Sequence, residues 1–385
     1  MSGMKRIRLI LVGLLLISGC ASNPLGYPDE QAAAYTAQIL NGTALGGEPI
    51  PEPEVDLLSL RSDIKQMLDQ KIDPRMHKRE KLDRVRNLMF GEDQLNIQYA
   101  SEATLTASET FDQRAGNCLA MTSLFIAAAR HVGLDADFQV VNVRPTWDFE
   151  GRTMIRYEHI VATGRITGEY YVMDFLPEFV LDGAKSTNVQ DSIATSLYHA
   201  NRGAELLIEE KFNEAYAQLR RALRLNPESS DIWTNIGALF SRTGKARLAE
   251  FAYRKALSLD GYNYSALNNL ATFYRRQGNE DMSEYYADRV KRYRHRNPYY
   301  HYFVAQMAFE NRMYDESRAL LERALSMKFD EPDFYEALAR VEELQGNKGE
   351  AKALLAKAKY YSKGKPQPPL RENNHRLFTQ VIEIN

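Results

Sequence analysis

Small residues recur every 34 positions through the second half of the chain, and this spacing constrains the fold more than any other feature. One set is Ala215, Ala249, Ser283, Ser317 and Ala351. Two further sets keep the same register: Ala222, Ala256, Val290, Ala324 and Ala358, and also Gly203, Gly237, Ala271, Ala305 and Ala339. Small side chains let two helices approach closely, so a period of this length predicts stacked pairs of antiparallel helices.

The period and the pattern resemble the tetratricopeptide repeat. The second copy fits best, with Trp233, Ile236, Gly237, Phe240, Ala249, Tyr253 and Ala256 at motif positions. The resemblance implies five repeats over residues 196–365, forming an all-α solenoid with a concave groove. The run Pro366-Gln367-Pro368-Pro369 then breaks the helical pattern, so residues 366–385 are expected to form a tail that docks or stays loose.

In tetratricopeptide proteins the first helix of each pair lines the concave face. Carrying that geometry over places aromatic and arginine side chains in the groove, and such groups are efficient anchors for a protein or peptide partner. A solvated helix face is the alternative, because no charge clamp for a C-terminal carboxylate is evident. The predicted groove residues are Asn268, Arg275, Arg276, Tyr299, Tyr302 and Gln306.

The N-terminus carries a second recognisable pattern. Basic residues precede an apolar run from Leu9 to Ile17 that is too short to span a bilayer. The following Ile17-Ser18-Gly19-Cys20 resembles the bacterial lipoprotein signal, which implies a signal peptide over residues 1–19. The alternative is a transmembrane anchor with an incidental cysteine.

The lipoprotein resemblance implies that Cys20 is the lipidated first residue of the mature chain. Several acyl chains on one cysteine hold a protein firmly to a membrane. Ala21, where Asp would retain the protein at the inner membrane, implies the outer membrane, with the protein facing the periplasm. Residues 20–54 are rich in Ala, Gly and Pro and are expected to form a flexible tether.

Residues 55–190 have a different texture. Apolar residues at three- and four-residue spacing predict helices, and a later change to a period of two predicts strands. Helices followed by an antiparallel sheet make an α+β domain. The predicted helices are Leu57–Ile72, His77–Phe90, Thr106–Gln113 and Leu119–Val132, and the predicted strands are Phe138–Val143, His159–Ala162 and Tyr170–Asp174.

With Cys20 lipidated, Cys118 is the remaining thiol, and a lone cysteine in a secreted protein is a liability unless it is buried or used. It follows Gly116-Asn117 at the head of the apolar helix, His159 opens a strand, and Asp174 closes the next. This order resembles the transglutaminase-like superfamily, relatives of the papain-type cysteine proteases.

The resemblance implies a catalytic set of Cys118, His159 and Asp174. A helix N-terminus lowers a cysteine pKa, His159 would be the base, and Asp174 would orient its ring. The oxyanion would be held by the backbone N–H of Cys118, with the Gln113 side chain as a further candidate. Taken singly, His159 fits a satisfied strand histidine better and Asp174 a strand-end turn residue, and a packed core position is the commonest fate of a free cysteine. Only the set of three favours a catalytic role.

The net charge and the spacing of the histidines bear on whether the protein binds nucleic acid or a metal ion. The formal net charge of −2 gives no basic excess for nucleic acid. His131, His199, His295 and His301 lack partners at metal-ligand spacing, so no metal and no cofactor are predicted. Two functions remain open: a lipid-anchored cysteine acyl transferase or protease, and a scaffold for envelope complexes whose transglutaminase-like domain is structural.

Overall fold

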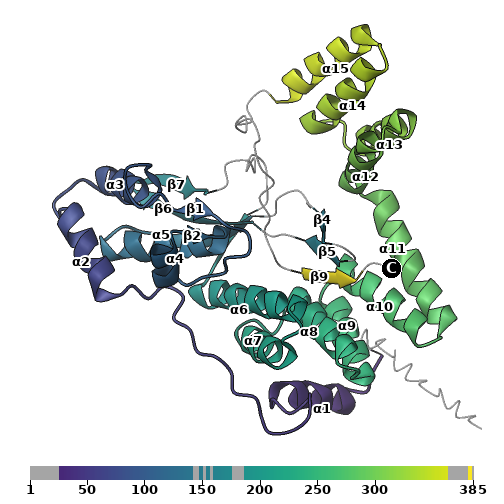
Figure 1. Ribbon diagram of the computed structural model, residues 1–385, viewed down its shortest axis with the longest axis horizontal. Helices are drawn as coiled ribbons and strands as arrows, with labels where there is room; N and C mark the ends of the chain where they lie inside the picture. The colour runs from purple at the N-terminus through teal and green to yellow at the C-terminus, as the bar shows by residue number, and fades with distance from the viewer. Residues whose placement is uncertain are drawn as a thin grey trace, which may run out of the picture.

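The computed structural model describes residues 26–141, 147–150, 153–156, 159–175, 186–362 and 380–383. An α+β domain comes first, and a row of paired helices follows and rises away from it (Figure 1). The signal segment and Cys20 lie outside the described residues, as do residues 363–379 of the last repeat and the tail.

The α+β domain is built on a four-stranded antiparallel sheet in the order β7-β6-β3-β8. Helix α5 packs on this sheet, and a short parallel pair, β1 with β2, leads into it. The elements are α2 (Ser62–Lys71), α3 (Lys78–Phe90), β1 (Gln98–Tyr99), α4 (Ala107–Gln113), β2 (Ala115–Gly116), α5 (Cys118–His131), β3 (Asp137–Val141), β6 (His159–Ile166), β7 (Glu169–Met173) and β8 (Ser186–Val189).

Most of the predicted elements are present, but the first helix is shorter than expected. It begins at Ser62 rather than at Leu57. The preceding residues give their backbone groups to α4 instead: the Leu57 carbonyl accepts from the Ala107 N–H, and the Ser59 carbonyl accepts from the Ser108 hydroxyl. Strand β8 was not predicted, because Ser186–Val189 has no apolar alternation.

In the described residues the solenoid contains five helix pairs, as the 34-residue period predicts. Its small residues are needed for close packing: a Cβ on Gly237 would lie 2.5 Å from the Tyr253 ring, and one on Gly203 would lie 2.7 Å from Leu219. The pairs are α6 (Asp191–Ile208) with α7 (Phe212–Leu225), α8 (Ser230–Arg242) with α9 (Ala246–Leu259), α10 (Tyr264–Arg276) with α11 (Glu280–Arg296), α12 (Pro298–Glu310) with α13 (Tyr314–Met327), and α14 (Pro332–Leu344) with α15 (Lys348–Tyr361).

The hydrophobic core extends across the boundary between the α+β domain and the solenoid. One continuous cluster runs from the α+β domain through the first three repeats to Val290 of α11. A second, separate cluster begins at Ala305 of α12 and fills the last two repeats. The first three repeats and the α+β domain therefore share one core.

Residues 29–54 are not the free tether expected from their composition. They begin with α1 (Asp29–Leu40), which lies against α7 and α9 (Figure 1). Ile39 is fully buried, and its carbonyl accepts a hydrogen bond of 2.6 Å from the Tyr216 hydroxyl. The Arg220 guanidinium donates to the carbonyls of Leu40 and Ile50 at 2.9 and 2.6 Å. These contacts with α7 hold the segment, and they have no local signature in the sequence.

The described part of the C-terminal tail docks. Strand β9 (Gln380–Glu383) pairs antiparallel with β5 (Thr153–Arg156), which in turn pairs with β4 (Trp147–Glu150). The sequence left both a docked and a loose tail open, and its patterns predicted none of these three strands.

Trp233 and Tyr302 test the packing of the solenoid. Trp233 is 2% exposed, and its ring meets that of Phe251 edge-on. We expect Trp233→Ala to lower the free energy of unfolding by about 3–5 kcal/mol, as for other buried aromatics. Tyr302→Ala should cost clearly less, because its side chain is only half-buried. Equal shifts of the two variants in denaturant titrations would contradict this packing.

Candidate active site

The pairing of β6 with β7 brings His159 and Asp174 together. His159 is the first residue of β6, and Asp174 directly follows β7. Because the strands are antiparallel, with Ala162 opposite Met173, the start of one lies beside the end of the other. The His159 Nε2 atom lies 2.8 Å from Asp174 Oδ1, and the histidine is fully buried.

An aromatic cluster holds the chain just beyond Asp174. The Phe175 ring centroid lies 4.6 Å from that of Phe90 on α3 and 5.6 Å from that of Phe125 on α5. Such contacts fix a side chain by packing on two independent helices. Phe175 is therefore fixed by packing, and this limits the movement of the neighbouring Asp174, whose carboxylate pairs with His159.

Cys118 begins α5 and lies against the same strand pair. The backbone N–H of Ile160, the residue after His159, donates to the Cys118 thiol. One turn along α5, the Thr122 hydroxyl donates to the Ile160 carbonyl at 3.3 Å. In addition to burial, the negative charge of Asp174 raises the pKa of the Cys118 thiol. The start of α5 thus lies beside the strand that begins with His159.

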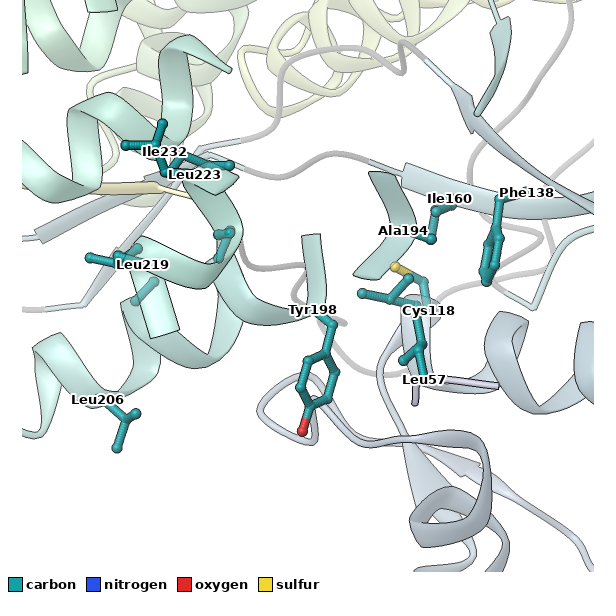
Figure 2. Close-up of a cluster of buried hydrophobic side chains, with 14 of the residues drawn as sticks. Leu57, Cys118, Phe138, Ile160, Ala194, Tyr198, Leu206, Leu219, Leu223 and Ile232 are labelled. Carbon is teal, nitrogen blue, oxygen red and sulfur yellow. The ribbon is translucent and has the colours of Figure 1, made fainter. Parts of the chain in front are cut away.

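The thiol differs from the activated cysteine expected at a helix N-terminus. Burial raises the pKa of Cys118 to about 12, and this outweighs the lowering by the backbone N–H groups of Ile160 and Leu119. The residue is only 6% exposed. It belongs to the buried cluster of Figure 2, which also contains Leu57 and, from α6, Ala194 and Tyr198. The expected low pKa is wrong for this conformation, because desolvation favours the neutral thiol.

The raised pKa of Cys118 can be measured. We expect its alkylation by iodoacetamide in the folded protein to accelerate without a plateau from about pH 8 to about pH 10, while the denatured chain levels off above the ordinary thiol value of about 8.5. Because the folded state holds the proton more tightly, rising pH over this window should also destabilise the wild type relative to Cys118→Ser. A plateau of the folded protein anywhere below about pH 10 would contradict the assignment.

The backbone before Cys118 needs the residues it has. A Cβ on Gly116 would lie 2.8 Å from the Ala120 Cβ and 3.1 Å from Thr110 Cγ2, so glycine allows this close approach to α5 and α4. Arg114 takes a left-handed conformation with φ of 49° to turn the chain from α4 into β2. Gln113, the oxyanion candidate, is the last residue of α4 and is exposed, whereas Cys118 is buried. Its role stays a prediction.

A buried hydrogen-bond chain behind Cys118 was not predicted from the sequence. Asn117 caps α5 by accepting from the Ala120 N–H at 3.0 Å. Its Nδ2 donates to the Thr104 hydroxyl at 2.8 Å, and Thr104 donates to Glu205 Oε1 at 2.6 Å. Asparagine before an apolar helix is a readable capping signal. Nothing in the sequence connects Thr104 with Glu205, which lies on α6 of the first repeat.

The predicted groove residues fall into two groups. On α10, Asn268 is half-buried, and Arg275 and Arg276 are exposed at the end of the helix. Arg275 makes a long hydrogen bond of 3.4 Å to the Thr272 hydroxyl. The two arginines are therefore placed where a partner can reach them.

The groove residues on α12 are less available. The ring centroids of Tyr299 and Tyr302 lie 5.5 and 5.0 Å from that of Phe334 on α14. Tyr299 also donates to Glu331 at 3.1 Å, and the Tyr302 hydroxyl accepts from Gln306 at 2.7 Å. These side chains join neighbouring repeats, so a binding role for them stays a prediction.

The described residues contain neither a metal-binding cluster nor a membrane-spanning helix. No group of three or more His, Cys, Asp and Glu side chains in these ranges is arranged to hold a metal ion. No helix in the described part of the chain combines the length and apolar character needed to cross a bilayer.

Comparison with protein families fits this geometry. Residues 65–175, which include Cys118, His159 and Asp174, match the transglutaminase-like superfamily. Residues 230–263 match the tetratricopeptide repeat. The chain contains a transglutaminase-like domain followed by tetratricopeptide repeats.

Several individual proteins resemble part of this chain. The tetratricopeptide repeat-containing protein trd-1 of Caenorhabditis elegans is 30% identical over 100 residues, which is 26% of this chain and 13% of that protein. Among solved structures, MamA is 16% identical with a TM-score of 0.25, covering 44% of this chain and 92% of its own. PilF of Pseudomonas aeruginosa is 18% identical with a TM-score of 0.27, covering 46% of this chain and 80% of its own.

Proposed function

We propose that the transglutaminase-like domain is a cysteine acyl-transfer enzyme that cleaves peptide or amide bonds, and that the repeats recruit its substrate or a protein partner. One observation carries the proposal. His159 and Asp174 lie 2.8 Å apart, and the backbone N–H of Ile160, the residue after His159, contacts the Cys118 thiol. A nucleophile, a base and a group that orients the base are the parts that such chemistry requires.

The contact with Asp174 assigns the two ring nitrogens of His159. An ionised carboxylate can only accept, so Nε2 keeps its hydrogen. Nδ1 is then the nitrogen left to take the proton from the Cys118 thiol when substrate entry opens the site. The sulfur then attacks the carbonyl carbon, and the Cys118 backbone N–H stabilises the oxyanion. His159 returns the proton to the leaving amine. Water, activated by the same ring, then hydrolyses the thioester and regenerates the thiol.

The high pKa of Cys118 decides how this step runs. A thiol with a pKa of about 12 is protonated at neutral pH, so His159 must remove the proton as the sulfur attacks. The thiol is also nearly inaccessible in this conformation, so substrate entry requires movement of the residues that bury it. We assign the structure to a closed resting state of the enzyme.

Substitution of the three site residues tests the enzyme proposal. We expect Cys118→Ala to abolish the cleavage of unfolded casein, followed by mass spectrometry, without unfolding the domain. His159→Ala should lower the rate by about a hundredfold or more because the base is lost. Asp174→Asn should be milder, since the ring stays in place.

The chain offers a matched control for His159. His131 Nε2 lies 2.9 Å from Asp69 Oδ1, a histidine–aspartate pair at the other end of α5. His131→Ala should leave cleavage unchanged. Activity that survives in Cys118→Ala would overturn the proposal.

A scaffold function is the second candidate, and the burial of Cys118 favours it. A packed, protonated thiol is the usual condition of a structural cysteine. In that case the repeats would assemble envelope complexes while the transglutaminase-like domain only stabilises them. Absence of any cleavage by the wild type, with intact binding of partners by the repeats, would support this function.

We further propose that Cys20 carries the lipid anchor, with the protein on the periplasmic face of the outer membrane. The lipoprotein-like Ile17-Ser18-Gly19-Cys20 supports this. We expect the wild type to sediment with membranes and Cys20→Ser to be recovered in the soluble fraction. Recovery of the wild type as soluble protein would refute the anchor.

A further inference from the structure

We propose that Glu205, a residue of the first repeat, is a positioning residue for the Cys118 nucleophile and acts through Thr104 and Asn117. The first repeat helix then forms part of the active site rather than a separate recruiting module. This inference rests on the proposed role of Cys118. It concerns which parts of the chain hold the thiol, and its test needs no catalytic turnover.

The chain of contacts is continuous and buried. Glu205 Oε1 accepts from the Thr104 hydroxyl at 2.6 Å, and the Thr104 oxygen accepts from Asn117 Nδ2 at 2.8 Å. Asn117 Oδ1 accepts from the Ala120 N–H at 3.0 Å, which caps the helix that begins with Cys118. Thr104 and Asn117 are 2% and 1% exposed, and Glu205 is 9% exposed. Water has little access to replace these partners.

The direction of each hydrogen bond follows from the charge at the end of the chain. A carboxylate only accepts, so the single hydroxyl hydrogen of Thr104 goes to Glu205. Thr104 must then accept from Asn117, which turns the amide nitrogen toward Thr104 and the amide oxygen toward α5. Arg202 pairs with the second Glu205 oxygen. Burial raises the pKa of Glu205, and the hydrogen bond from Thr104 and the charge of Arg202 oppose this rise only in part.

The hydrogen-bond chain can fix the position of the thiol because it ends at the residue next to Cys118. Asn117 directly precedes Cys118, and its own N–H donates to the Ala103 carbonyl at 3.0 Å. Cap and nucleophile are thus adjacent residues tied to the segment that carries Thr104. Because Glu205 belongs to α6, a shift of the first repeat against the α+β domain would break the chain at Thr104 and loosen the cap.

Alkylation of the full chain by iodoacetamide, measured at Cys118 by mass spectrometry over a range of pH, tests this role. We expect Thr104→Val to raise the rate in the folded protein by about tenfold, the effect of losing a helix cap, and to lower the apparent thiol pKa. Thr104→Ser keeps the hydroxyl and should restore the wild-type profile. Glu205→Gln keeps an acceptor but also offers a donor, so we expect an intermediate increase.

Thr234→Val is the matched control. Thr234 is a fully buried threonine on α8 whose hydroxyl donates to the Ser230 carbonyl at 2.8 Å. Its loss should lower stability without changing the alkylation profile of Cys118. Equal profiles for Thr104→Val and Thr234→Val would overturn the inference, because the hydroxyl would then be structural only.

Two further outcomes separate this inference from the enzyme proposal. If Thr104→Val does not fold, Glu205→Gln decides, and an unchanged profile in that variant overturns the positioning role. If the profiles shift as expected while the wild type cleaves no peptide, the positioning chain stands and the enzyme proposal fails.

Discussion

The burial of α5 from its first residue to Ala129 is the constraint on which the rest of the structure depends. Every residue from Cys118 to Ala129 is buried, so the helix has no face for solvent and must be covered on all sides. The sheet covers one side through β6 and β3, and α2, α3 and α4 pack elsewhere on it. Cys118, in the first turn, inherits this burial together with its raised pKa. The same packing that builds the domain sets the chemistry of the thiol.

Structural features that depend on a repeated spacing, or on the order of residues along the chain, were predictable from the sequence. The 34-residue spacing gave the five helix pairs, because each small residue marks a close approach that every repeat must make. The order of Cys118, His159 and Asp174 placed one residue at a helix start and two at neighbouring strand ends. Antiparallel pairing then requires the two strand ends to meet. The His159–Asp174 contact is a consequence of that register.

Contacts between distant segments were not predictable. The Ala-, Gly- and Pro-rich segment before residue 55 docks because Arg220 and Tyr216 of α7 donate to its carbonyls, and its own composition suggests only a spacer. Thr104 and Glu205 are 101 positions apart and have no shared pattern. The balance between helix dipole and desolvation at Cys118 also depends on what packs over it. The residues next to Cys118 in the sequence do not show which distant segments pack over it.

The division of the solenoid into two cores has a consequence for cooperativity. Residues that share a buried cluster tend to open together, and separate clusters can open independently. The α+β domain and the first three repeats share one core, whereas the last two repeats have their own. The distal pairs form a separate unit that can fluctuate, or be remodelled by a bound protein, while the thiol stays enclosed. The chain thus combines a stiff proximal body with an adaptable distal arm.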